Sequence, residues 1–320
     1  MTVVTEQRAE RATEDETTDE PEQVVRAEGL VKTFGETTAV DGVSATVGGG
    51  EVFALVGPNG AGKTTFVRCL TGTVVPDAGS VELFGVPTDA VDADQIGVLP
   101  QSFSPQGRLT PHEIVSYHAG LYEQARDPAT VLREVGLAPD RETFYENLSG
   151  GEKRRVAVGT TLVNDPDLIF LDEPTTAVDP AGRHRLWDLF ESIAADGTTI
   201  VLTTHDMAEA ERLADRVGLL AKGRLVATGA PKDVVAEHGG PTRLVVETDD
   251  RSADLPAFET TRTDDGLVVK NIEPTKIGDV VRSLDASGVD FDALSWREPT
   301  LEDAYLALVD DAGSDTEWTR

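Results

Sequence analysis

The stretch "GPNGAGKTT", residues 57–65, constrains the fold more than any other part of this chain. It follows an apolar run, Val52–Val56, that is typical of a buried strand, and it precedes "TFVRCLTG", which is typical of a helix. Glycines at such a junction leave backbone N–H groups free to surround phosphates. In this pattern Lys63 reaches the β- and γ-phosphates and the Thr64 hydroxyl can bind Mg²⁺. The loop residues expected to surround the nucleotide are Gly57, Pro58, Asn59, Gly60, Ala61, Gly62, Lys63, Thr64 and Thr65.

Apolar runs later in the chain predict the rest of the core. "LIFL" (168–171), "TIVLT" (199–203) and "VGLLA" (217–221) are short, continuous and separated by helix-like segments. This pattern is typical of a parallel sheet that helices cover on both faces. Strand-like segments at 44–57 and 80–86 add an antiparallel sheet beside the first buried strand. The fold class predicted is α/β.

The region from about 101 to 165 is expected to be mainly helical. Thr110 and Glu113 have the spacing of a capping box, and Pro111 occupies the first position of the helix that they would begin. We therefore expect residues 24–240 to form one nucleotide-binding domain with 101–165 as its helical subdomain.

The ends of the chain differ from this domain. Residues 1–23 and 312–320 are predicted to be acidic tails, the first of them disordered. Between 241 and 311, strand-like and helix-like segments alternate, which predicts a small separate α+β domain. Its last segment, 299–309, has the pattern of a capped amphipathic helix.

The charge of the chain is extreme. The formal net charge is −30, the isoelectric point is about 4.4, and only seven residues are lysines. Such a charge destabilises a compact state in dilute buffer, but molar salt reduces the Debye length to about 3 Å. We infer a cytoplasm of very high ionic strength, with an ordinary acidic protein as the alternative. The acidic surface disfavours nucleic acid as a partner, because phosphate contacts need lysine and arginine.

Two other composition features limit the interpretation. The single cysteine, Cys69, cannot form an internal disulfide and is expected to pack in the core. No run approaches eighteen uncharged apolar residues, so no segment is predicted to span a membrane.

Several polar residues follow the predicted buried strands. "LIFLDEP" (168–174) ends in Asp172, which suits the Mg²⁺ shell, and Glu173, which could orient and deprotonate an attacking water. His205 follows another strand and would lie near the γ-phosphate, although a lone histidine is more often a structural hydrogen bonder. Gln101 follows the strand-like "IGVLP" (96–100), where a glutamine is usually only polar surface. For the two carboxylates the alternative is a strand end with solvated acids.

A second glycine-rich anion site, "LSGGEKRR" (148–155), comes after the first. With it, the chain resembles the nucleotide-binding subunit of ABC transporters over about residues 26–235. The resemblance rests on the phosphate loop, the glutamine loop at Gln101, the signature "LSGGE", the acidic motif "LIFLDEP", the D-loop "TTAVDP" (175–180) and the switch histidine His205, all in the family's order.

This resemblance implies that two copies pack head to tail. Ser149, Gly150 and Gly151 of one copy would then bind the nucleotide held by the other, and Asp179 would connect the two sites. Gln101 would take part in catalysis and in binding Mg²⁺. Phe34 would stack on the adenine, with an ordinary core phenylalanine as the alternative. The departures from the family pattern are Glu152, Val178 and Phe34, which stand where glutamine, leucine and tyrosine are usual.

The function implied is that of an ATP-hydrolysing motor, with ATP and magnesium as cofactors. It would work as a homodimer on a separate transmembrane permease, which places it in the cytoplasm, peripheral on the inner face of the cell membrane. The 241–311 region with "PTLED" (299–303) looks like the appendage of drug- and antibiotic-type exporters. The alternative is a soluble ABC ATPase that acts on ribosomes, DNA or iron–sulfur assembly.

Overall fold

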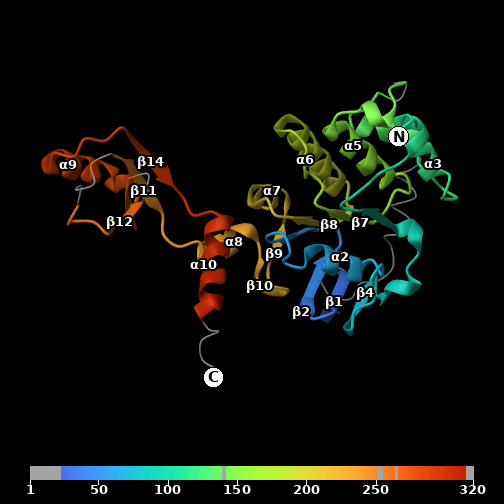
Figure 1. Ribbon diagram of the computed structural model, residues 1–320, viewed down its shortest axis with the longest axis horizontal. Coiled ribbons are helices and arrows are strands. Elements are labelled where there is room, and N and C mark those ends of the chain that lie inside the picture. Colours follow the sequence, from blue (N-terminus) through green and yellow to red (C-terminus); the bar gives the residue numbers. More distant parts are fainter. Residues whose placement is uncertain (1–22, 139–141, 249, 251–254, 264–265, 315–320) are drawn as a thin grey trace, which may run out of the picture.

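The computed structural model describes residues 23–138, 142–248, 250, 255–263 and 266–314. Two sheets and a group of helices form the larger part of the molecule, and a third sheet lies to one side of it (Figure 1). The predicted tail at 1–23 falls outside the described residues except for Gln23, where the first strand begins.

The central sheet has six strands in the order β10-β9-β3-β8-β7-β6. All neighbours are parallel except β9 and β10. Its strands are β3 (Val52–Val56), β6 (Ile96–Leu99), β7 (Leu168–Asp172), β8 (Thr199–Thr204), β9 (Arg216–Ala221) and β10 (Arg224–Gly229).

Alternate residues of the central strands enter two different cores. In β3, Phe53 and Leu55 pack with α2 (Lys63–Leu70) and the antiparallel sheet, whereas Ala54 and Val56 pack with the helices on the other face. A strand buried on both faces must be apolar at every position. The predicted parallel sheet covered on both sides is therefore confirmed.

The predicted antiparallel sheet is also confirmed. It has four strands in the order β2-β1-β4-β5. These are β1 (Gln23–Phe34), β2 (Thr37–Gly48), β4 (Ala78–Leu83) and β5 (Val86–Pro87). Buried Cys69 of α2 packs in the core beneath this sheet, as expected from its apolar surroundings.

Helices dominate residues 101–165. They are α3 (Pro111–Ala119), α4 (Pro128–Glu134) and α5 (Gly150–Thr160). The expected capping box begins α3: Thr110 and Glu113 bond each other's backbone N–H groups. Next to the sheet lie α6 (Pro180–Ala195), α7 (Met207–Leu213) and α8 (Pro231–His238).

The C-terminal sheet has the order β12-β13-β11-β14 and a core of its own with α9 (Ile277–Ser287). Its strands are β11 (Arg243–Glu247), β12 (Thr260–Thr263), β13 (Gly266–Lys270) and β14 (Ala293–Arg297). The polar strand β12, "TTRT", has no apolar alternation and is absent from the sequence-based expectation.

The last helix, α10 (Leu301–Ser314), differs from the expectation in two ways. Its apolar face packs against α7 and α8, because Leu301, Ala304 and Tyr305 enter the core of the larger part, and only an ion pair between Asp303 and Arg243 of β11 is recorded between the helix and the C-terminal sheet among the described residues. Its N-terminus is fixed there by Glu211 of α7, whose carboxylate accepts the Leu301 N–H at 2.5 Å. The helix also continues to Ser314, past the predicted start of the tail at 312.

Within the part of the chain that the structure describes, each helix is too short or too polar to cross a lipid bilayer.

Candidate nucleotide site

The glycine-rich loop joins the buried end of β3 to α2. A Cβ at Gly57 would lie 2.3 Å from the Leu220 carbonyl oxygen, and one at Gly62 would lie 2.1 Å from the Ala39 carbonyl oxygen. Gly62 also has φ of 109°, which other residues rarely adopt. Only glycine fits at either position. The tip of the loop, Pro58–Gly60, remains exposed and able to meet a ligand.

Lys63 is the buried cation of this loop. Its side chain is 4% exposed, and Nζ donates to the carbonyl oxygens of Gly57 at 2.7 Å and Pro58 at 3.1 Å. The same ammonium lies 3.5 Å from Oε1 of Glu173. The sequence-predicted lysine and catalytic carboxylate are thus brought together, although 110 positions separate them in the chain.

Asp172 and Thr64 form a cluster of oxygen atoms beside this pair. Thr64 Oγ1 donates to Asp172 Oδ1 at 3.2 Å, and Thr203 Oγ1 donates to the same oxygen at 2.5 Å. Hydroxyl and carboxylate oxygens are the ligands that Mg²⁺ prefers, usually one or two from the protein with phosphates supplying others. The residues present therefore fit Mg²⁺. No cluster of three His, Cys, Asp or Glu side chains suited to a metal occurs among the described residues.

Glu173 is held in an unusual backbone conformation with φ of 49°. Its N–H donates to Oγ1 of Thr203 at 3.0 Å, and its carboxylate accepts from Thr176 at 3.0 Å. Burial by itself would raise the pKa of Glu173. The hydrogen bond from Thr176 and the charges of Lys63 and His205 outweigh that effect, so the pKa lies below its ordinary value. Glu173 is therefore ionised at neutral pH, as a base must be.

The other predicted residues are distributed around this centre. His205 Nδ1 lies 3.6 Å from Oε1 of Glu173. Gln101 is exposed just after the edge strand β6. Phe34 is 53% exposed at the end of β1, so it is not an ordinary core residue, and Nζ of Lys32 lies 5.5 Å from the centre of its ring.

The second glycine-rich motif begins α5 in the helical subdomain, whereas the first begins α2. Ser149 caps α5, and its hydroxyl donates to Glu152 Oε2 at 2.9 Å. A Cβ at Gly150 would lie 3.2 Å from the Ala177 carbonyl oxygen, which places the D-loop beside the signature within one chain. Asp179 caps α6 by accepting the Gly182 N–H at 3.0 Å.

Sequence reasoning missed three residues of the site. Thr203 and Thr176 bond Asp172 and Glu173, but each has the appearance of a common strand or loop threonine. Arg154, inside the signature helix, reaches the backbone behind Glu173. Its position three residues after Gly151, within the quoted motif, was the available signal.

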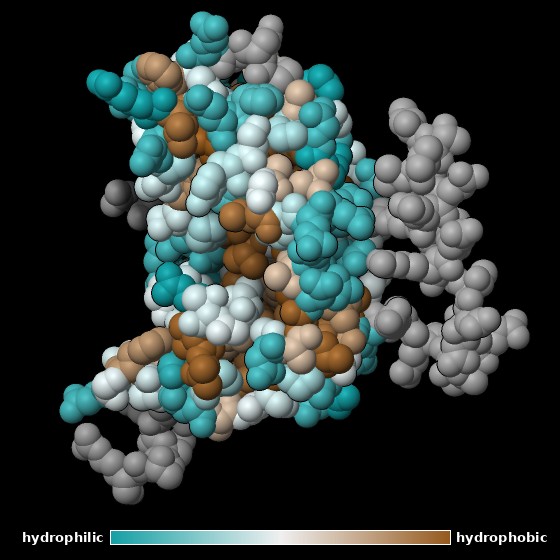
Figure 2. Space-filling model, turned by 90° about the vertical axis from the view of Figure 1, so that its right-hand side faces the viewer, coloured by the Kyte–Doolittle hydropathy of each residue, from teal (hydrophilic) through white to brown (hydrophobic). Residues whose placement is uncertain are grey.

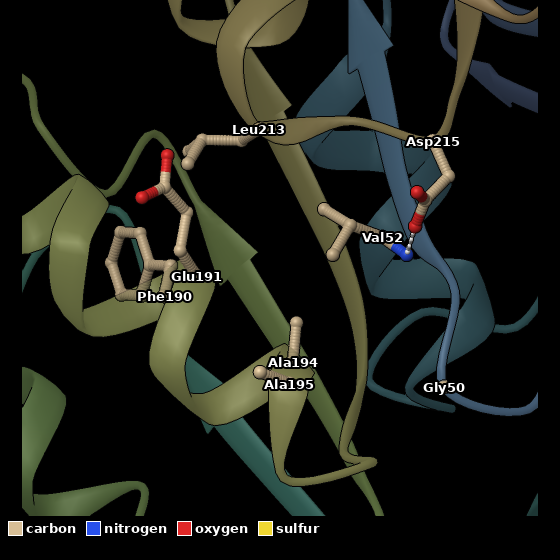
Figure 3. A pocket seen from close by; sticks show the side chains of 8 residues that line it. All are labelled: Gly50, Val52, Phe190, Glu191, Ala194, Ala195, Leu213 and Asp215. Carbon is tan, nitrogen blue, oxygen red and sulfur yellow. Dashed lines mark hydrogen bonds between the residues drawn. The ribbon is translucent and has the colours of Figure 1, made fainter.

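A cavity of about 310 Å³ lies at the opposite end of β3 from the glycine-rich loop. Figure 3 shows it between Val52, where β3 begins, and Ala194 near the end of α6. Asp215 accepts the Val52 N–H at 2.9 Å on its wall. Ligands of such sheets bind outside the carboxyl ends of the strands, so this cavity is not part of the nucleotide site.

Comparison with known proteins agrees with this geometry. The family model described as "ABC transporter" matches residues 40–176. The Nod factor export ATP-binding protein I of Paraburkholderia xenovorans is 41% identical over 228 residues, which cover 69% of this chain and 75% of that protein. This chain belongs to the ABC transporter family. It is an ATP-binding subunit of the exporter type, and it hydrolyses ATP.

The similarity extends through the C-terminal sheet. The daunorubicin resistance ATP-binding protein DrrA3 of Streptomyces coeruleorubidus is 31% identical over 316 residues, which cover 90% of this chain and 96% of that protein. The predicted transport motor is thereby confirmed over the soluble alternative.

Solved structures share the fold. An ATP-binding subunit of an ABC transporter has a TM-score of 0.61 and 28% identity, covering 68% of this chain and 93% of its own. A dimeric ATP-binding cassette with bound ADP and Pi has a TM-score of 0.58 and 25% identity. The match covers 64% of this chain and 98% of that one.

Proposed function

We propose that this ABC subunit is the Mg²⁺-dependent motor of an exporter, and that it acts as a homodimer on a separate permease at the inner face of the cell membrane. The observation that carries the proposal is the convergence of Lys63, Glu173 and the Asp172–Thr64 pair at the carboxyl ends of β3 and β7. Phosphoryl transfer needs these parts: a cation, an ionised base and oxygen ligands.

Each side chain has a defined role in hydrolysis. Lys63 would exchange its bonds to the loop carbonyls for the β- and γ-phosphates. The ionised Glu173 would orient the attacking water and accept its proton, with His205 beside it to contact the γ-phosphate. Thr64, Asp172 and Gln101 would hold Mg²⁺, which supplies neutralising charge at the phosphates. Phe34 would stack on the adenine.

The signature motif supports the homodimer. Since Ser149, Gly150 and Gly151 begin a helix in another subdomain than the loop that carries Lys63, we assign them to the nucleotide of the second copy. The Ser149 hydroxyl is held by Glu152, so a phosphate arriving from the second copy would compete with a carboxylate. Asp179, which caps α6 next to Gly151, would lie at the same interface.

A groove of about 430 Å³ fits the permease partner. It lies between the helical subdomain and the antiparallel sheet, next to Gln101, and its wall includes Val91, Val98, Phe103 and Tyr122. Figure 2 shows this side of the molecule, where hydrophobic residues gather in a hollow. Exposed apolar surface bounded by polar residues marks an interaction site. A permease segment here would contact the loop that carries Gln101.

The test is purification of the tagged full chain from native membranes solubilised in molar salt. We expect a multi-spanning membrane protein without its own ATPase domain to co-purify, and ATPase activity that Glu173→Gln abolishes. A Glu173→Gln chain should also remain as an ATP-stabilised dimer in size-exclusion chromatography. Absence of the chain from membranes would contradict the exporter, and an unchanged rate in Glu173→Gln would contradict the assignment of the base.

A further inference from the structure

The side chain of Arg154 leaves helix α5 and binds the backbone of Asp172–Pro174, which we call the catalytic turn. Nη2 donates to the carbonyl oxygens of Asp172 at 2.8 Å and Glu173 at 2.9 Å, and Nε donates to that of Pro174 at 2.7 Å. Nη1 donates to the Pro100 carbonyl at 3.2 Å, one residue before Gln101. A single guanidinium thus joins the signature helix, the catalytic turn and the glutamine loop.

The three neighbouring carbonyls converge only because the chain turns sharply at Glu173. Along an extended strand, successive carbonyls point in opposite directions. The turn depends on the left-handed conformation of Glu173, with φ of 49°, which is unfavourable for a residue other than glycine. Such a conformation persists only where the surroundings determine it. The guanidinium of Arg154 helps to hold this conformation by binding the carbonyl oxygens of the turn.

The charge of Arg154 suits this place. Burial lowers the pKa of its guanidinium, while Asp172, Tyr145, Glu173 and Glu209 favour the charged form. An arginine stays ionised in proteins, so the donors remain available at any working pH. Its planar fork also presents several donors in fixed directions, which a lysine does not.

We propose that Arg154 is a positioning residue for ATP hydrolysis, which fixes the turn that aims Glu173 and links that turn to the signature helix and to the residue before Gln101. The inference rests on the proposed role of Glu173. Movement of α5, whose first residues would meet the nucleotide of the second copy, is transmitted through Arg154 to the base of its own site.

The test compares Arg154→Gln and Arg154→Lys with Arg185→Gln in the full chain at molar salt. Arg185 is the matched control, because it is also an arginine on a helix, α6, and its Nε also donates to a carbonyl oxygen, that of Ala181 at 3.2 Å, away from the catalytic turn. We expect both Arg154 variants to keep the wild-type affinity for ATP and to lose about tenfold or more in kcat. They should accumulate the ATP-bound dimer, and Arg185→Gln should behave as wild type.

Two results would overturn the proposal. One is a wild-type kcat in Arg154→Lys. This variant keeps the positive charge and the aliphatic part of the side chain, so the comparison remains valid if Arg154→Gln does not fold. The other is a parallel loss of ATP affinity and kcat, which a merely structural role produces. Failure of the underlying function is recognised separately, because Glu173→Gln would then hydrolyse ATP at the wild-type rate.

Discussion

Replacing Thr203 by valine tests how the site holds its acids. Thr203 is fully buried in β8, and its hydroxyl donates to Asp172 Oδ1 at 2.5 Å while accepting the Glu173 N–H at 3.0 Å. Valine has nearly the same shape, so Thr203→Val removes these bonds and opens no cavity. No sequence motif marks this threonine.

The size of the effect follows from the two bonds. A hydrogen bond to a charged group contributes about 1.5–3 kcal/mol to stability. Loss of the bond from the Glu173 N–H should cost less, because this N–H also donates to the Thr203 backbone carbonyl at 3.1 Å. We expect the free energy of unfolding to fall by about 2 kcal/mol. Without this donor the Asp172 carboxylate should also be less well fixed. We expect kcat to fall about tenfold, which corresponds to an activation barrier higher by about 1.4 kcal/mol.

Thr199→Val is the matched control. Thr199 belongs to the same strand, but its hydroxyl accepts the uncharged Gly50 N–H at 3.0 Å at the end remote from the nucleotide. Loss of that neutral bond should cost about 1 kcal/mol and leave kcat unchanged. The assays are urea unfolding in molar KCl and phosphate release at saturating ATP. Equal losses of stability in the two variants, or a wild-type kcat in Thr203→Val, would refute the reasoning.

Three further predictions concern the site and the surface. Lys63→Ala should abolish tight ATP binding in an equilibrium titration; an unchanged affinity would contradict the phosphate-loop assignment. Because the folded pKa of Glu173 is lowered, its ionised form stabilises the protein above the ordinary pKa, and this contribution disappears as the pH falls through the lowered value. Thr176→Val removes a hydrogen bond that lowers the pKa of Glu173, so the acidic limb of the pH profile of kcat should shift to higher pH. A shift to lower pH would contradict this expectation. Dialysis to about 10 mM salt lengthens the Debye length to about 30 Å, and the net charge of −30 should then unfold the chain; an unchanged circular dichroism spectrum would count against the high-salt interpretation.

The sequence by itself determined the parts whose signals are local. The apolar run Val52–Val56 followed by glycines and Lys63 requires a buried strand, a turn and a helix in that order, because each depends only on neighbouring residues. The capping box at Thr110 and Glu113 is similarly contained within four residues. Motif order then led to the family, and with it to the assignment of Glu173 and His205.

Tertiary structure decided the contacts between residues far apart in the chain. The pairing of Lys63 with Glu173 and the bond from Thr203 to Asp172 depend on which strands become neighbours in the sheet. No local sequence pattern specifies that order of strands. The four carbonyls around Arg154 belong to backbone groups, which carry no sequence signal at all. The position of α10 was also decided at this level: its amphipathic face required an apolar partner, and only the fold shows that α7 and α8 supply it.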